Sequence, residues 1–364
     1  MIAVLVGGTL FVSADSGGEA SLRESAGVKG LSGLSGEDII KSKTSPPEGG
    51  ADYKGYIVKI ADEAVARIDA KAMKNASKCI VGDRIALVDK PKDVLKFASA
   101  GDVEIIEPNY IYSSFAAPIA DAIDPIYTNQ NNYQWGVKYV NASVAWQLGY
   151  RGDDVNIAIL DSGIVKGHED LGGDKIIEEW NWIGGNSNTA DDNMHGSVVG
   201  GIIAADTGNY RLGTTEGVGM AGIADKSNLI IHKVLDKSGY GDIGILYALY
   251  DVLHDGNRVD VVNMSLGGSG NSNILNGMIQ DIAAKGTIIV AASGNNGDAT
   301  DGTANEMNYP AGCDNVIGVG SIGKTGAVSP FSTKNSSVDV VAPGELMVGL
   351  QAGTTNGYYE ASGS

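Results

Sequence analysis

The sequence predicts an α/β fold, in which a parallel central sheet carries helices on both faces and a small α+β unit precedes it. Apolar runs such as "VNIAIL", "LIIHKVL", "VDVVNM" and "TIIVAAS" alternate with helical patterns in the second half of the chain. Runs that are apolar almost throughout are typical of strands buried on both faces. The 364 residues, 43% of them apolar, are enough for one large core and one small core.

The first 52 residues lack apolar periodicity beyond an initial apolar run. "MIAVLVGGTLFVSA" ends in a small-x-small pattern, so residues 1–14 predict a secretory signal peptide and a secreted or extracellular protein. The basic start typical of such signals is missing, and a disordered tail is the alternative. Residues 15–52, rich in Gly, Ser and charge, predict a flexible linker.

The small unit is predicted over residues 53–115. "YKGYIVKI", "RIALVD" and "VEIIEPNYIYS" favour strands. "DEAVARIDAKAMKNA" and "KPKDVLKFASAG" favour helices, the second ending at Gly101. This succession predicts a compact α+β unit of the βαββαβ kind.

The large unit is predicted over residues 118–364. "NASVAWQLG" predicts a short helix, and small residues follow His195 in a second helix, "HGSVVGGIIAA". In "DIGILYALYDVLHDG" the apolar side chains share one face, with Asp242 as cap and Gly256 as stop. A further helix is predicted from Ser272 to Lys285, and "VIGVG" and "VDVVAPG" predict the last strands of the sheet.

Charge and composition argue against several classes of function. A net charge of −18 repels phosphates and therefore argues against nucleic-acid binding. No apolar run has the length of a membrane span. Cys79 and Cys313 fall in different predicted units, so neither a disulfide nor a zinc site is predicted. "GVGMAG", Gly217 to Gly222, matches a dinucleotide fingerprint but lacks a strand before it and a helix after it.

Three polar residues follow predicted strands or lie in adjacent loops, where parallel sheets form their sites. They are Asp161, His195 and Asn295. Taken alone, Asp161 allows a phosphate acceptor, a metal ligand or a structural cap. Asn295, in "SGNNG", allows a simple turn residue or a donor to a developing negative charge.

His195 differs from the other histidines in its surroundings. His232 lies within an apolar strand and favours a core role, and His168 lies in the polar loop "GHEDL". His254 lies near the carboxyl end of a helix, where the dipole favours a cation. His195 begins a helix of small residues that can approach the sheet closely and leave the imidazole facing a cleft.

Five segments, "AILDSGI", "NMHGSVVGGIIAA", "VVNMSLGG", "VAASGNNG" and "DVVAPG", occur in this order and resemble the subtilisin-like serine peptidase (subtilase) family. Subtilisin itself is the reference case for the triad order Asp, His, Ser. The resemblance covers roughly Asp124 to Ser364 and implies the subtilisin-like fold. The unit before it resembles the ferredoxin-like inhibitory propeptide of that family, which implies an intramolecular inhibitor.

The resemblance also implies site roles. Asp161 matches the residue that orients the histidine, His195 the general base, and Asn295 the oxyanion-hole donor. Ser265, Leu266 and Gly267 match the edge that pairs with the backbone of protein or peptide substrates. Asn296 and Asn308 are candidates for the pocket that binds the residue before the cleaved bond.

Two positions depart from, or only partly match, the family pattern. Asp170 in "HEDL" matches a calcium-binding aspartate, but the region that usually completes the site, "DTGNYRLGTTEGVGMAG", is altered. Structural calcium is therefore expected without a full ligand set. The family commonly has a second histidine where this chain has Val198, which is expected on the buried side of the helix.

The nucleophile of the family lies in Gly-Thr-Ser-Met-Ala. Aligning the final "SGS" places Gly363 on the Gly and Ser364 on the Thr, so the nucleophile is expected at the next position. The alternative register makes Ser364 the nucleophile.

Two hypotheses about function follow. One is a secreted endopeptidase made as a zymogen, of which residues 1–364 lack the nucleophile and are expected to be inactive. The other is a non-catalytic, peptide-binding or inhibitor-like product.

Overall fold

The computed structural model describes residues 35–364 apart from 49, 62–63, 65–67, 69–79, 82–83, 115–116, 119–133, 173, 208–218, 255–257 and 300–302. The predicted signal peptide, most of the first predicted helix and Cys79 lie outside the described residues. The chain divides into two compact units. The larger contains residues 47–54 and 108–364, and the described part of the smaller contains 35–46 and 55–107.

The smaller unit has a four-stranded sheet in the order β2-β3-β1-β4. Antiparallel pairs join β1 to β3 and β3 to β2. Apolar side chains such as Ile40, Val58, Val88 and Ile106 form its core. The bounds are β1 Tyr53–Ile60, β2 Ile80–Val81, β3 Ile85–Val88, β4 Val103–Tyr110, and two short 3-10 helices, Pro91–Lys96 and Ala100–Asp102.

Helix α1 (Gly36–Ser42) lies within residues 15–52, predicted to be a linker, and corrects that prediction over its own seven residues. Ser35 caps it, since its hydroxyl accepts a hydrogen bond from Asp38 N while the Asp38 carboxylate accepts one from Ser35 N. This capping box stabilises the first turn, and Ile40 anchors the helix in the core. A helix of only two turns has too few apolar positions to show a period, so composition suggested a linker instead.

The larger unit confirms the predicted parallel sheet. Seven strands follow the order β15-β14-β13-β11-β7-β9-β8, and every neighbouring pair is parallel. The five inner strands are buried along most of their length, as the apolar runs predict, whereas the edge strands β8 and β15 are partly exposed. The bounds are β7 Asn156–Asp161, β8 Ile176–Asn181, β9 Asn228–Lys233, β11 Val261–Met264, β13 Ile288–Ala292, β14 Val316–Ile322 and β15 Val340–Pro343.

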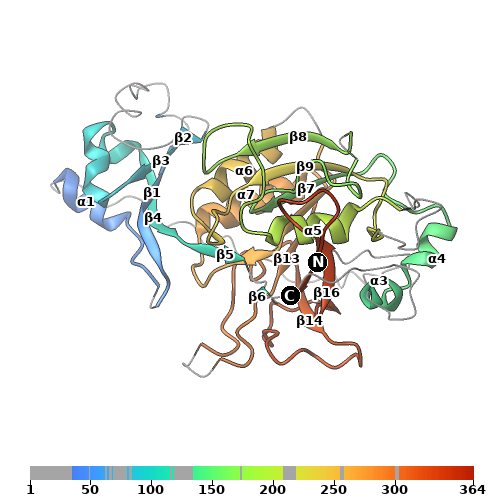
Figure 1. Cartoon of the computed structure of the whole chain (residues 1–364). Coiled ribbons are helices and arrows are strands. Elements are labelled where there is room, and N and C mark those ends of the chain that lie inside the picture. The colour runs from blue at the N-terminus through green and yellow to red at the C-terminus, as the bar shows by residue number, and fades with distance from the viewer. Residues whose placement is uncertain are drawn as a thin grey trace, which may run out of the picture. The chain divides into compact units, whose positions relative to one another are not determined.

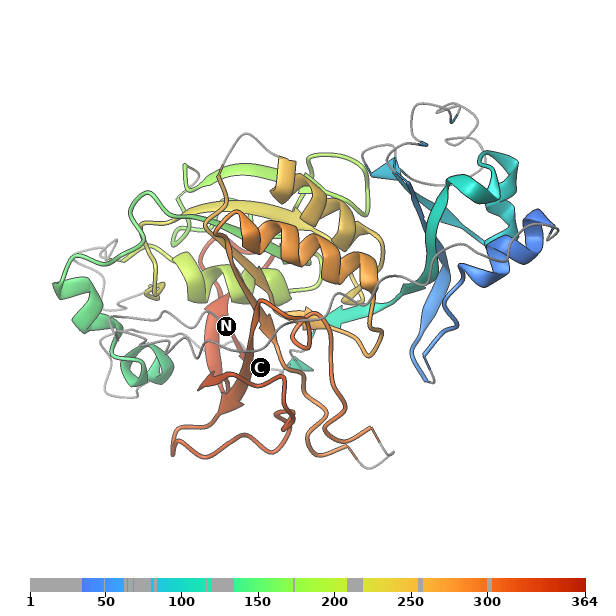
Figure 2. The same cartoon turned by 180° about the vertical axis from the view of Figure 1, so that it is seen from behind.

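Helices cover both faces of this sheet. Helix α5 (His195–Ala204) lies on the face seen in Figure 1, whereas α6 (Gly244–His254) and α7 (Asn273–Ala284) lie side by side across the opposite face in Figure 2. All ten residues of α5 are buried, between the sheet and β16 (Met347–Leu350). Two shorter helices, α3 (Trp135–Tyr139) and α4 (Ala142–Gln147), precede β7.

Two small sheets flank α5 and bring distant segments together. One has the order β10-β5-β12, from Tyr240–Gly241, Tyr112–Ser114 and Leu266–Gly267. The other has the order β16-β17-β6, where β17 is Tyr358–Ser362 and β6 is Ala117–Pro118. The small unit thus ends at Glu107, within β4, and residues 108–114, which the sequence assigned to it, belong to the larger unit.

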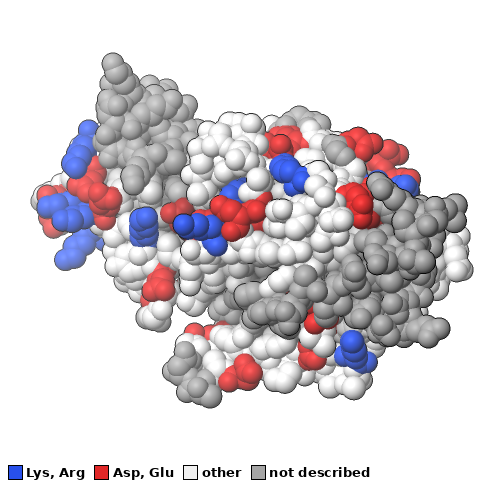
Figure 3. Space-filling view, in the orientation of Figure 1, with Lys and Arg blue, Asp and Glu red and all other residues white. Residues whose placement is uncertain are grey.

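The surface carries charges of both signs. On the face in Figure 3, Lys and Arg lie among Asp and Glu, without a continuous basic patch on the described residues. Cys313 is a free, buried thiol, and burial raises its pKa to about 12. Within the described ranges, every helix is too short or too polar to cross a bilayer.

Candidate active site

Asp161 and His195 form a buried pair at the carboxyl end of β7. His195 Nδ1 lies 2.7 Å from Asp161 Oδ1 and 2.9 Å from Oδ2. The aspartate is 0% exposed and the histidine 7%. A carboxylate can only accept, so Nδ1 carries the proton and donates it to this bond. The other ring nitrogen, Nε2, is then free to accept a proton.

The start of helix α5 is held by Asp191, a residue for which the sequence predicts no role. Its Oδ1 accepts from Asn193 N and Met194 N, each at 3.0 Å, and its Oδ2 accepts from Ser197 N at 2.8 Å. These bonds satisfy amides that would otherwise be unpaired at the helix start. They also hold Met194 at a φ of 97°, a strained value for a residue with a side chain.

Gly196 allows α5 to lie close to the loop after Asp161. A Cβ at this position would come within 2.1 Å of the Gly163 carbonyl oxygen. Without a side chain at this position, the two segments approach closely enough for Gly196 N to donate to Ser162 Oγ at 2.9 Å. Ser162 Oγ in turn donates to Asp191 Oδ1 at 2.9 Å. The small residues after His195 therefore serve the close approach that the sequence predicts.

Lys233, at the end of β9, adds a buried cation near the pair. Its side chain is 5% exposed, and Nζ lies 2.7 Å from Asp192 Oδ1. Nζ also donates to the backbone oxygens of Ser162 and Leu235. The lysine thus fixes the residue that follows Asp161. Its sequence signal is weak, because it is a single charge at the end of an apolar strand.

Asn295 and Ser364 contact each other across the site. Asn295 Oδ1 accepts from Ser364 N at 3.0 Å and from Ser364 Oγ at 2.7 Å. Ser364 Oγ also lies 2.8 Å from the Gly294 oxygen. The amide oxygen of Asn295 is therefore engaged, and its Nδ2 remains as the donor that could face a substrate.

The predicted substrate edge pairs with another segment of the chain. Leu266 lies opposite Ser114 and Gly267 opposite Ser113, in antiparallel register. On its other side β5 pairs with β10. Ser265 lies just before this edge, and its hydroxyl accepts from Asn263 Nδ2 at 3.1 Å.

The two candidate pocket asparagines are held by loop contacts. Asn296 Nδ2 donates to Thr303 O, and its Oδ1 accepts from Thr333 Oγ1, each at 2.5 Å. Asn308 Nδ2 donates to Ser293 O at 3.1 Å. None of these three bonds is to the edge strand or to His195, and neither asparagine lines the cavity beside His195, so their contacts hold the loops around Asn295.

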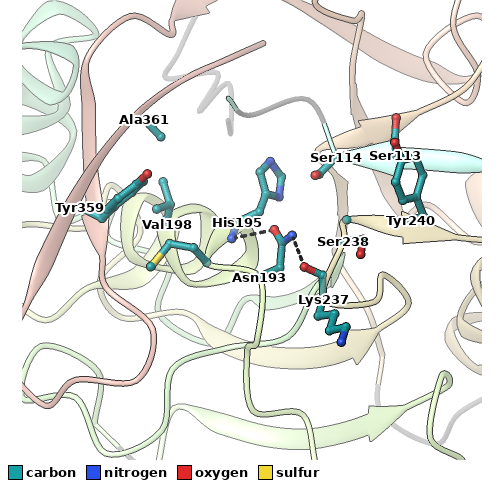
Figure 4. Close-up of a pocket in the computed structure, with 12 residues that line it drawn as sticks. Ser113, Ser114, Asn193, His195, Val198, Lys237, Ser238, Tyr240, Tyr359 and Ala361 are labelled. Atoms are coloured by element: carbon teal, nitrogen blue, oxygen red, sulfur yellow. Dashed lines mark hydrogen bonds between the residues drawn. The ribbon is translucent and has the colours of Figure 1, made fainter. Parts of the chain in front are cut away.

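A cavity of about 360 Å³ lies beside the pair. Figure 4 shows the imidazole of His195 directed into it, between Ser114 on one side and Val198 and Ala361 on the other. Tyr240 and Tyr359 form further walls. Val198 is 5% exposed like the rest of the buried helix α5, but it lines the same cavity as His195.

Asp170 lies apart from this cavity and is engaged by protein donors. Its Oδ2 accepts from Met220 N and from the Tyr358 hydroxyl, each at 2.6 Å. Calcium takes six to eight oxygen ligands. Among the described residues no group of three or more His, Cys, Asp or Glu could hold a metal. The described residues therefore supply Asp170 as one carboxylate candidate and no further cluster of acidic ligands around it.

The remaining histidines have structural contacts. His168 Nε2 lies 2.8 Å from Gly357 O, and the Trp182 indole donates to His232 Nδ1 at 3.1 Å. His254 Nδ1 bonds to Tyr250 O within the last turn of α6.

The fold and site define an α/β protein in which a buried carboxylate–imidazole pair lies beside a strand-binding edge, an arrangement suited to general acid–base chemistry on a peptide. Residues 152–364 match the model of the Subtilase family. The chain therefore belongs to the subtilase family, and by family it is a serine endopeptidase.

Curated relatives agree with this assignment. The chain is 30% identical to a thermophilic serine proteinase of Bacillus sp. (strain AK1), over 85% of this chain and 75% of the relative. It is 31% identical to the minor extracellular protease Epr of Bacillus subtilis (strain 168), over 77% of this chain but only 40% of that protein. The major intracellular serine protease of the same organism is 35% identical, over 61% and 69% of the two chains.

Proposed function

We propose that the protein hydrolyses peptide bonds through an acyl-enzyme and is made as a zymogen. The observation that carries the proposal is the buried Asp161–His195 pair, with Nδ1 bonded to the carboxylate at 2.7 Å and Nε2 left to accept a proton. The adjoining edge strand Leu266–Gly267 supplies backbone groups for an extended substrate.

In the proposed reaction a serine hydroxyl attacks the scissile carbonyl carbon, and its proton passes to His195 Nε2. Asp161 stabilises the imidazolium that forms. The proton then passes to the leaving amine as the carbon–nitrogen bond breaks. Asn295 Nδ2 is the proposed donor to the carbonyl oxygen while it bears negative charge. Water then hydrolyses the acyl-enzyme.

The proposed nucleophile is the residue after Ser364. The Ser364 hydroxyl makes short bonds to Gly294 O and Asn295 Oδ1, so its contacts lie with the Asn295 loop. These contacts suit the residue before the nucleophile. The alignment of Gly363 and Ser364 with the Gly and Thr of the family motif gives Ser364 the same place.

The zymogen proposal rests on β5. This segment lies along the substrate edge in the antiparallel register that an extended peptide would adopt, and Ser113 and Ser114 line the same cavity as His195. This position supports the proposal that the segment acts as an inhibitor of the groove. Secretion is proposed from residues 1–14 alone, since the relatives include both extracellular and intracellular proteases.

The direct test is hydrolysis of an unfolded protein such as casein by the product of the full reading frame, after processing. We expect the Asp161→Asn variant to lose about 10⁴-fold in kcat, the loss found when the triad aspartate of another serine protease is changed. Equal rates for the variant and the unaltered protein would contradict the proposal. Absence of hydrolysis in both would favour the non-catalytic, peptide-binding alternative.

Calcium binding stays a prediction. If Asp170 binds calcium, Ca²⁺ should raise the Tm more than Mg²⁺ does at equal ionic strength. The Asp170→Asn variant should then show no difference between the two ions. An equal effect of both ions would leave Asp170 as an acceptor for Tyr358 and Met220 alone.

A further inference from the structure

The segments that contain β5 and β12 stay in close contact beyond the two residue pairs that join these strands. Ser114 lies opposite Leu266 and Ser113 opposite Gly267. The same antiparallel register, continued by three residues, places Tyr112 opposite Gly268 and Tyr110 opposite Gly270. Close contacts agree with it, because a Cβ on Gly268 would lie 2.5 Å from Ile111 O and 3.5 Å from Tyr112 Cα.

Gly270 leaves room for the ring of Tyr110. A Cβ on Gly270 would lie 2.1 Å from Tyr110 Cγ, 2.2 Å from Cδ1 and 2.7 Å from Cβ. Cβ and Cγ do not move when the ring turns about the Cβ–Cγ bond, so such a rotation cannot relieve the overlap. The tyrosine is 4% exposed in this position. An aromatic ring packed over a cross-strand glycine is a favourable pair in an antiparallel sheet.

The backbone conformation of Gly270 does not require glycine, because its φ does not lie in the left-handed region. The missing side chain therefore serves the contact with Tyr110. Tyr112, two residues on, faces the same side of the extended segment and is 6% exposed. Both tyrosines of the segment are thus buried, and Tyr110 packs against Gly270.

We propose that residues 266–270 form one continuous peptide-binding edge, and that Gly270 provides a site for an aromatic side chain. The ligand is an extended peptide with Tyr or Phe four positions before the residue opposite Leu266. In this chain Tyr110 fills the site. This inference rests on the proposed function, in which β5 occupies the groove that substrates use.

The test is a double-mutant cycle on the full chain, with hydrogen exchange of the Tyr112–Ser114 amides as the readout. Gly270→Ala overpacks the contact and is expected to speed this exchange about tenfold. Tyr110→Ala removes the ring and also speeds it. In the Tyr110→Ala background, Gly270→Ala is expected to add less than about twofold, because the obstacle is gone. Gly277→Ala, in α7 with open space around its Cβ, is the matched control and should leave the exchange unchanged.

A Gly270→Ala effect of the same size in the unaltered and the Tyr110→Ala backgrounds would overturn the inference, as would no effect in either. A second measurement covers the substrate. Processed enzyme should prefer peptides with Tyr over Ala at the position that Tyr110 occupies here, and Gly270→Ala should remove the preference. Because the exchange cycle needs no catalysis, a protein that shows coupling but cleaves nothing would contradict only the proposed function. Cleavage without coupling would contradict only this inference.

Discussion

Asp191 is a single side chain that holds the proposed catalytic pair, Asp161 and His195, in place from outside the pair. It bonds to the loop before α5, to the first turn of α5 through Ser197, and to Ser162 beside Asp161. The position of His195 relative to Asp161 therefore depends on this carboxylate.

Asp191→Asn tests that dependence. An amide keeps one acceptor oxygen, so either the Ser197 donors or the Asn193 and Met194 amides lose their partner. We expect the free energy of unfolding to fall by about 2 kcal/mol, and kcat to fall with little change in KM. Denaturant unfolding and steady-state kinetics measure both. Asp298→Asn, at an exposed loop position, is the control and should stay within about 0.5 kcal/mol.

The candidate residues differ in how far the sequence could predict them. Asp161 and His195 follow from the rule that parallel strands end at one edge, which brings together residues 34 positions apart. Asp191 lies in the acidic loop before the helix, but its bonds depend on turn geometry that no pattern encodes. The partners of Asn296, Thr303 and Thr333, are likewise set by the folded loop.

Between secondary-structure elements, an ion pair joins the loops before β7 and after α5. Arg151 Nε donates to Asp225 Oδ1 at 2.8 Å, and the aspartate side chain is 0% exposed. Burial raises the pKa of Asp225, but the hydrogen bonds from Arg151 and Thr207 outweigh it and hold the pKa below its usual value. The charged form is thus favoured in the folded state.

This ion pair makes the stability of the protein depend on pH. Because the folded pKa is depressed, the pair stabilises the protein above the unfolded pKa of Asp225, and the contribution is lost as the pH falls through the folded pKa. We expect Asp225→Asn to cost about 2 kcal/mol at pH 7, and the difference from the unaltered protein to shrink below about pH 4. Denaturant unfolding at a series of pH values measures this. Asp153→Asn, an exposed neighbour of Arg151, should change little. A difference that grows on acidification would contradict the assignment.

Elements were predictable in proportion to their length and period. Helix α7 was predicted from Ser272 to Lys285. It spans Asn273–Ala284, with Ser272 as its N-cap and Lys285 as its C-cap. The strands of the parallel sheet follow the apolar runs. Helix α1 was missed because its signal is a capping box and not a period. The pairing of β5 with β12 joins residues about 150 positions apart, and only the folded chain brings these edges together.

For the whole molecule, the sheet and the two flanking small sheets converge on His195. The parallel sheet supplies Asp161, α5 supplies the imidazole, and β17 leads to Ser364 beside Asn295. The fold class was predictable from the alternation of apolar strand runs with helical patterns. The boundary between the units was not, because it falls within β1 and β4, and residues 47–54 and 108–114 belong to the larger unit.

The proposed function depends on this pair activating a serine immediately after Ser364. Labelling of the full reading-frame product with a fluorophosphonate probe, followed by peptide mapping, identifies the activated residue. We predict a label on the residue after Ser364, and none in the His195→Ala variant. A label on Ser364 itself would refute the proposed register, and no label on the folded and processed protein would refute the proposed acyl-enzyme.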